Sequence, residues 1–234
     1  MFSFFDAFCN VFIHYGLAVA VRGFPTYNIS MIDYMQKGGP LMWLLVLLSI
    51  VATVTFFERL LYYHRVSIRV GDFLRGLSNL LGAGRFAEAL HECAGTAGPV
   101  ARVLHAALIR HEAPRAELKE IVQEAGQLEM PKLERRLTML ATVAYVAPMV
   151  GLLGTVTGLI DAFTTLSSNA GGIATAADIS GGVYKSLLPT AAGLVVAIPA
   201  ALAYSFLSAR VNTIMHDMER AGIEIVNMIK EKKA

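Results

Sequence analysis

The residue types that most often catalyse reactions or bind metals are scattered through this sequence. The histidines form no HExxH motif or similar metal-ligand spacing; they are His14, His64, His91, His105, His111 and His216. The run His91-Glu92-Cys93 is interpreted as a solvated helix face. Gly82-Ala83-Gly84 precedes no Gly-Lys-Ser/Thr and is not a phosphate-binding loop. We therefore expect no enzyme activity, no cofactor and no metal.

Two threonines are better candidates for chemistry. Thr155 and Thr190 each lie in a long stretch without any Asp, Glu, Lys or Arg. If both face the axis of a ring of protomers, their hydroxyls form a polar collar. From the residues alone, the favoured interpretation is instead that each hydroxyl bonds to a carbonyl of its own helix, which is common for threonine in membrane helices.

The elements that must position these threonines are membrane spans. The chain is 55% hydrophobic and 16% charged, whereas a soluble domain has about 25% charged residues. Three stretches have no Asp, Glu, Lys or Arg: 38–57, 137–160 and 186–209. A helix needs about 20 apolar residues to cross a bilayer, so all three are predicted to span it. Buried helices of a soluble protein are the less favoured alternative.

The N-terminal segment 1–37 contains a shorter apolar stretch, residues 7–21, which includes Asn10 and His14. It is short for a span and lacks the basic residues that begin a signal peptide. We expect an interfacial helix there, with a tilted fourth span as the alternative.

The basic residues predict the orientation of the spans. Residues 58–136 and 210–234 hold seventeen Lys and Arg, whereas residues 1–37 and 161–185 hold three. Basic residues concentrate on the cytoplasmic side. Segments 58–136 and 210–234 are thus predicted to be a cytoplasmic helical domain and a cytoplasmic helical tail. Segments 1–37 and 161–185 are predicted to be periplasmic, and Cys9 and Cys93 therefore lie on opposite sides.

The cytoplasmic segments read as helices separated by glycine and proline. We expect helices near 70–81, 85–93 and 100–111. From Arg115 the pattern predicts one long helix that continues into the span 137–160. Its apolar positions are Leu118, Ile121, Val122, Ala125, Leu128, Leu133 and Leu137. The tail extends the third span with a second apolar stripe, at Ile214, Met218, Ile223, Val226 and Ile229.

The three spans differ in composition. The first has bulky residues from Leu41 to Ile50 and is expected to face lipid. The second and third are rich in Gly and Ala, which allow helix backbones to approach closely in lipid. This composition fits either a tight helix pair within one protomer or close packing around the central pathway of a symmetric oligomer.

Topology places the two threonines at similar depth. Thr155 is about 7 Å from the outer end of the second span, and Thr190 is about 6 Å from the outer start of the third. On the third span Thr190 shares a face with Ser186 and Tyr204, and on the second Thr155 shares one with Gly151 and Gly158. Pro148, Pro189 and Pro199 are expected to kink the helices, and the carbonyls they free must face protein or water.

The spans contain no carboxylate, histidine or basic residue. Proton relays in membranes use such ionisable groups. Asp161 and Lys185 lie at the outer ends and are interpreted as markers of the interface. A proton pathway through this chain would therefore need a carrier group from another polypeptide.

These segments resemble the MotA/TolQ/ExbB proton channel family, nearest ExbB and TolQ. The resemblance rests on LATVAYVAPMVGLLGTVTGLIDAF (140–163), LLPTAAGLVVAIPAALAYSFL (187–207) and KGGPLMWLLVLLSIVATVTFFERLLY (37–62). It covers almost the whole chain after residue 30.

The resemblance implies an all-α integral membrane protein that forms a pentamer in the bacterial inner membrane. A single-span partner of the ExbD/TolR type would supply the membrane aspartate that carries the proton. A TonB- or TolA-like protein is a further implied partner, and no nucleic acid is expected. Thr155 and Thr190 match the pore threonines of the family, which favours the functional interpretation of both.

The sequence also departs from the family pattern. Lys185 stands where the well-studied type has a glutamate near the outer start of the third span, and Pro189 is an extra proline. The charge reversal argues against proton relay at that position and against the iron-uptake subgroup. The favoured function is a channel subunit that couples the proton motive force to work across the periplasm. The alternative is a non-conducting scaffold that recruits partners through its cytoplasmic helices.

Overall fold

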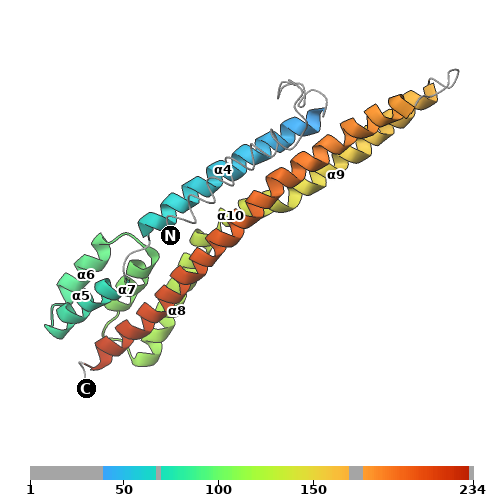
Figure 1. Cartoon of the computed structure of the whole chain (residues 1–234). Coiled ribbons are helices and arrows are strands. Elements are labelled where there is room, and N and C mark those ends of the chain that lie inside the picture. The colour runs from blue at the N-terminus through green and yellow to red at the C-terminus, as the bar shows by residue number, and fades with distance from the viewer. Residues whose placement is uncertain (1–38, 67–69, 169–175, 232–234) are drawn as a thin grey trace. The chain divides into compact units, whose positions relative to one another are not determined.

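The structure describes residues 39–66, 70–168 and 176–231, which form helices joined by short turns. The structure is a computed structural model (Figure 1). Its helices are α4 Pro40–Val66, α5 Val70–Gly82, α6 Phe86–Gly95, α7 Pro99–Ile109, α8 Arg115–Glu134, α9 Leu137–Ser168 and α10 Ala176–Glu231. The predicted interfacial helix at 7–21 lies outside the described residues.

Three of these helices, α4, α9 and α10, are long and apolar enough to cross a membrane. The α9 and α10 helices contain the charge-free stretches 137–160 and 186–209 and continue beyond them, and α4 covers residues 40–57 of the first stretch and continues to Val66. The α9 helix reaches Ser168 and α10 starts at Ala176, so much of the segment 161–185 is helical. The all-α class with three candidate spans is therefore confirmed.

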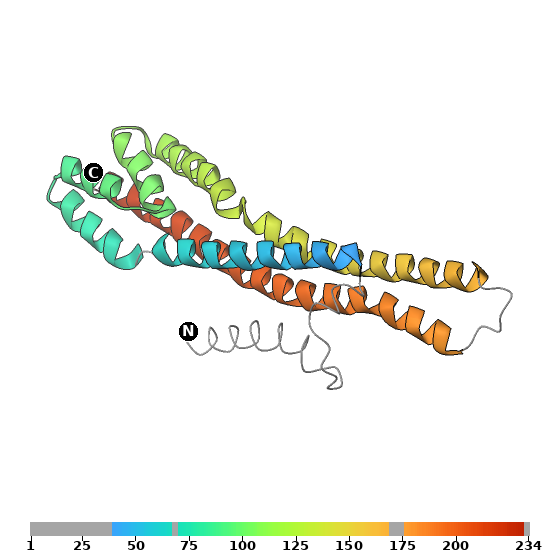
Figure 2. The same cartoon turned by 90° about the horizontal axis from the view of Figure 1, so that it is seen from above.

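The described residues form two compact units. The first combines the residues up to Phe56 with Met139–Tyr204, and the second combines Phe57–Thr138 with the residues from Ser205 onward. In the first unit, the initial part of α4 runs beside α9 and α10 (Figure 2). Its core is a cluster of small and branched side chains: Leu45, Ala147, Val150 and Ala197.

The contacts of α4 correct one expectation. The first span was expected to face lipid, but Leu45, Ala52 and Phe56 are buried on one side of it. The other side keeps Trp43 and Ile50 exposed. Sequence composition missed this because leucine is as suitable for a helix contact as for lipid.

The second unit packs α5, α6 and α7 against α8 and the end of α10. Its core contains Leu77, Leu104, Leu118 and Ile225. The α7 helix starts with Pro99 directly after Gly98, whose φ of 147° is one that residues with a side chain rarely adopt. Proline is favoured at a helix start because it has no amide hydrogen to satisfy.

The predicted continuous helix from Arg115 into the second span is wrong. The α8 helix ends at Glu134, and α9 begins at Leu137. In a continuous helix the Leu133 carbonyl accepts the amide of Leu137. Here the buried hydroxyl of Tyr63 donates to that carbonyl at 2.8 Å, and Arg136 pairs with Glu58. Two residues of α4 thus hold the turn between α8 and α9.

Two members of the predicted apolar stripes also point the wrong way. Leu128 is 70% exposed, and Ile223 is 59% exposed. Their neighbours Glu129 and Ile225 are buried instead. A glutamate is an unexpected core residue, and its burial depends on the charged partners described below.

Candidate functional site

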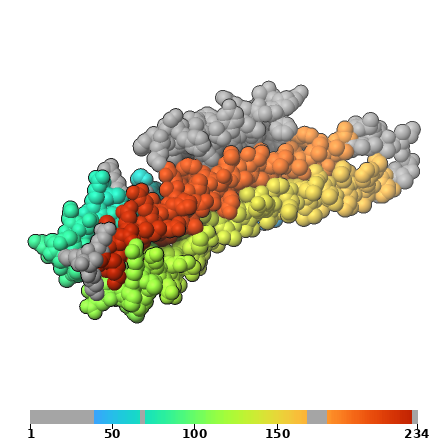
Figure 3. All heavy atoms as spheres, turned by 90° about the horizontal axis from the view of Figure 1, so that it is seen from below, coloured from blue at the N-terminus to red at the C-terminus, as the bar shows by residue number. Residues whose placement is uncertain are grey.

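The centre of the candidate site is the contact between α9 and α10 in the first unit (Figure 3). Glycines bring the two backbones together. A Cβ added at Gly193 would lie 2.6 Å from the Ala147 carbonyl oxygen, and one at Gly151 would lie 2.8 Å from that of Pro189. Because both neighbours are backbone atoms, neither contact can be relieved by a side-chain rotation.

The same packing continues toward the C-terminal end of α9 and the N-terminal end of α10. A Cβ at Gly158 would lie 2.7 Å from Cβ of Ser186, and one at Gly182 would lie 2.6 Å from Cβ of Ala162. A Cβ at Gly154 would overlap Pro189. The small residues that the sequence singled out therefore form a continuous helix contact.

Thr190 links the two helices directly. Its hydroxyl donates to the carbonyl oxygen of Gly151 at 2.9 Å. Thr155 lies one turn beyond Gly151 on α9, and its hydroxyl donates to the Leu152 carbonyl of its own helix at 2.6 Å. The two candidate threonines thus make different bonds: Thr155 bonds within its helix, and Thr190 bonds across the contact.

The structure places the other candidate residues around this contact. Ser186 is 1% exposed, packs on Gly158 and donates to the Val183 carbonyl at 2.8 Å. Lys185 is exposed, and Tyr204 is partly exposed. The structure brings Ser186 and Thr190 to the α9 side of α10, whereas Lys185 and Tyr204 remain accessible in the single protomer.

The three membrane prolines lie inside continuous helices. Pro148 is within α9, and Pro189 and Pro199 are within α10. Pro189 contributes to the contact itself, since its carbonyl faces Gly151 and its ring faces Gly154. Its packing in this contact explains why the neighbouring positions on α9 are glycines.

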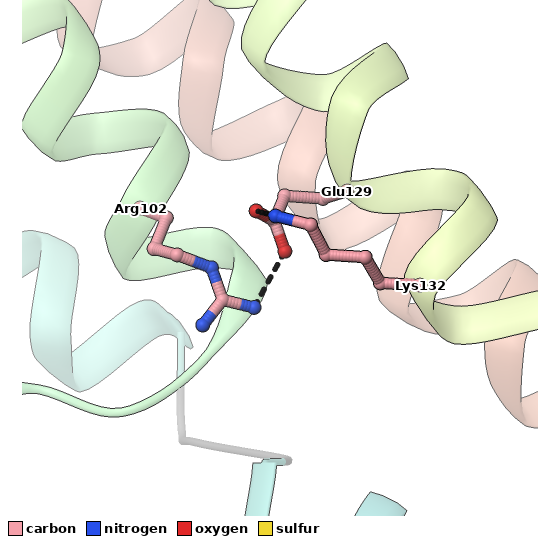
Figure 4. Close-up of polar contacts among 3 residues, drawn as sticks. All are labelled: Arg102, Glu129 and Lys132. Atoms are coloured by element: carbon pink, nitrogen blue, oxygen red, sulfur yellow. Dashed lines mark hydrogen bonds and ion pairs between the residues drawn. The ribbon is translucent and has the colours of Figure 1, made fainter.

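The second unit contains a charged cluster that sequence reasoning missed. Glu129 of α8 is 5% exposed. Its Oε2 accepts a hydrogen bond from Arg102 of α7 at 2.5 Å, and its Oε1 accepts one from Lys132 at 2.7 Å (Figure 4). Burial opposes ionisation of Glu129, but the hydrogen bonds from Arg102 and Lys132 outweigh it and lower its pKa.

This cluster connects α7 to α8 through the ion pair between Arg102 and Glu129. Its signal in the sequence is weak: Glu129 and Lys132 are three residues apart, but Arg102 is 27 residues away from Glu129. Among the residues that the structure describes, no group of three His, Cys, Asp or Glu side chains is arranged to hold a metal ion.

Comparison with known proteins adds to these observations. The model of the MotA/TolQ/ExbB proton channel family matches residues 96–220, slightly more than half of the chain. This range includes α9, Thr155, Thr190 and most of α10.

Individual relatives support the same assignment. The chain is 33% identical over 215 residues to "Putative biopolymer transport protein ExbB-like 1" of Synechocystis sp., which covers 89% of this chain and 82% of the relative. It is 42% identical over 112 residues to "Tol-Pal system protein TolQ" of Haemophilus influenzae, a match that covers 47% of this chain and 48% of the relative. It is 40% identical over 104 residues to "Biopolymer transport protein ExbB" of Xanthomonas campestris pv. campestris, a match that covers 42% of this chain and 40% of the relative. The chain therefore belongs to the MotA/TolQ/ExbB proton channel family, nearest ExbB and TolQ.

Proposed function

We propose that this chain is the proton-channel subunit of an inner-membrane motor. The motor couples the proton motive force to mechanical work across the periplasm and energises outer-membrane transport or envelope processes. The observation that carries this proposal is the pair of threonine hydroxyls at and beside the α9–α10 contact, Thr155 and Thr190. They lie in helices whose charge-free stretches contain no carboxylate, histidine or basic residue.

A channel of this composition needs its proton carrier from elsewhere. We propose a single-span partner of the ExbD/TolR type, whose membrane aspartate carries the proton past the threonines. In a homo-pentamer, Thr155 and Thr190 of each protomer form a polar collar around the partner. Each hydroxyl can accept from the aspartate when the aspartate is protonated. To donate to the ionised aspartate, each hydroxyl exchanges the backbone carbonyl that it binds here, Leu152 for Thr155 and Gly151 for Thr190. A TonB- or TolA-like protein then receives the motion.

The proposed topology follows from the basic residues. Seventeen of the twenty Lys and Arg lie in segments 58–136 and 210–234. The cytoplasm is the side where such residues concentrate. The second structural unit and the C-terminus are therefore proposed to be cytoplasmic, and the N-terminus and the outer ends of α9 and α10 periplasmic.

Reconstitution into proton-tight vesicles tests the proposal. The complex with its partner is expected to pass protons, and Thr155→Val or Thr190→Val is expected to abolish that flux while the oligomer still assembles. Thr157→Val is the matched control, because Thr157 is exposed and its hydroxyl bonds to the Leu153 and Gly154 carbonyls of its own helix. Flux equal to wild type in both Thr155→Val and Thr190→Val contradicts the proposal. No flux in any partner state favours the non-conducting scaffold instead.

A further inference from the structure

The last turns of α4, in the second unit, contain a buried arginine, Arg59, which is 8% exposed. Among the residues that the structure describes, its Nε has no hydrogen-bond partner. The guanidinium carbon lies 5.2 Å from the ring centre of Tyr62. Within the part of the chain that the structure describes, no carboxylate forms an ion pair with it. A buried charge without a counter-ion is destabilising, so this arrangement requires an explanation.

The nearby carboxylates differ in their availability. Glu58 already pairs with Arg136, and Glu129 already binds Arg102 and Lys132. Glu134 is exposed, and among the described residues it has no ion pair. It is therefore the carboxylate of this region that is free to accept a partner.

The backbone brings Glu134 close to the turn of α4 that carries Arg59. Glu134 directly follows Leu133, whose carbonyl accepts the Tyr63 hydroxyl at 2.8 Å. Tyr63 is four residues after Arg59, one helical turn along α4. Burial raises the pKa of the Tyr63 hydroxyl, and the charge of Glu134 is near enough to contribute to that rise, so we expect a displacement of the end of α8 to bring the Glu134 carboxylate to the guanidinium.

The helix is interrupted at the junction between α8 and α9. Glu134 is the last residue of α8, and Arg135 and Arg136 form a turn before α9. The turn is held by the bond from Tyr63 to Leu133 and by the half-exposed pair of Glu58 and Arg136. Burial raises the pKa of Tyr63 above its ordinary value of 10.0, although Arg59 opposes this, so the hydroxyl keeps the proton that it donates.

We propose that the junction between α8 and α9 adopts two conformations, in which the end of α8 takes two positions relative to α4. Tyr63 and Glu58 hold the position described here, and in the second position Glu134 pairs with Arg59. Each position satisfies a group that the other leaves unsatisfied: the Leu133 carbonyl in the first, and Nε of Arg59 in the second. Exchange between such alternative contact sets is a known form of protein switching. The proposal concerns residues 58–136 and does not rest on the proposed channel function.

Distance measurements between spin labels test whether the α8–α9 junction has these two conformations. Leu61 of α4 and Leu128 of α8 are both exposed, so Leu61→Cys and Leu128→Cys can carry the labels in a full-length Cys9→Ser, Cys93→Ser protein. The labelled chain is diluted with unlabelled chain in lipid nanodiscs, so that each distance arises within one protomer. Two distances are expected. Tyr63→Phe should raise the share of the second distance about fivefold, the effect of losing one hydrogen bond.

The decisive step adds a second substitution to Tyr63→Phe. Glu134→Gln should abolish the second distance, whereas Glu120→Gln, at an exposed site on the same helix, should leave it unchanged. Tyr62→Phe keeps the ring beside Arg59, so the share of the second distance should stay as in the protein without this substitution. A single distance in Tyr63→Phe, or a second distance that survives Glu134→Gln, overturns the proposal.

Discussion

The hydroxyl of Thr190 on α10 donates to the carbonyl oxygen of Gly151 on α9, at 2.9 Å. Thr190 is thus both a candidate for the proton pathway and a link between the two helices that form the candidate site. A substitution at Thr190 therefore changes the helix contact as well as the chemistry, and the two effects have to be separated.

Replacement of Thr190 by serine and by valine separates these effects. Thr190→Ser keeps the hydroxyl and should retain both the contact and the proton flux. Thr190→Val has nearly the same shape and should lower stability by about 0.6 kcal/mol, typical of a hydrogen bond between membrane helices. Its proton flux in vesicles should be lost although the oligomer elutes normally. Loss of flux in the serine variant as well would indicate that the methyl packing, and not the hydroxyl, is required.

Gly193 should tolerate no side chain. In Gly193→Ala the new methyl would meet the Ala147 carbonyl oxygen at 2.6 Å, so α9 and α10 must separate. Overpacking of this kind costs about 1–3 kcal/mol. We expect a lower unfolding midpoint in detergent and weaker assembly of the oligomer.

Gly181→Ala is the matched control for this substitution. Gly181 is in the same helix, and a Cβ there would meet none of the described residues within 4 Å. Alanine favours a helix over glycine by up to about 1 kcal/mol, so this variant should be as stable as wild type or more stable. Equal destabilisation by both substitutions would contradict the close contact at Gly193.

The sequence predicted much of the first structural unit because its signals are local. A charge-free stretch of 20 residues or more predicts a span regardless of its neighbours. Glycines on one face of a helix predict a close contact, and Gly151 and Gly158 are both in the contact between α9 and α10. The partner of Thr190 could not be predicted, since it depends on how the two helices align.

The second unit was harder to predict because its decisive contacts join residues far apart in the chain. The break after Glu134 depends on Tyr63, which is 70 residues before the carbonyl that it binds. The buried position of Glu129, with Leu128 turned outward, depends on Arg102 in another helix. A pattern of apolar residues places Leu128 inside, because it cannot anticipate that a paired carboxylate occupies the core.

Cys93 is expected to react very slowly with thiol reagents. It is buried, and burial, reinforced by Glu92, raises the pKa of its thiol from 9.0 to about 11. A rise of this size lowers the thiolate fraction at neutral pH about a hundredfold, and the thiolate is the reactive form. In a Cys9→Ser variant, maleimide labelling should be at least that much slower in the folded protein than in urea. Rapid labelling of the folded protein would show that α6 opens readily.

The Glu129 cluster should stabilise the second unit in a pH-dependent way. Glu129→Gln keeps the shape but removes the charge that binds Arg102 and Lys132, and should cost about 1–3 kcal/mol at pH 7. Since folding lowers the pKa of Glu129 from 4.5, its contribution is complete above that pH and is lost as the pH falls through the lower value of the folded state. Urea unfolding followed by circular dichroism should therefore give free energies of unfolding for wild type and Glu129→Gln that are far apart at pH 7 and converge below pH 4.5.

Glu124→Gln, at an exposed position of the same helix, is the control and should match wild type at both pH values. A gap between wild type and Glu129→Gln that is unchanged at low pH would mean that the side chain acts through packing and not through its charge.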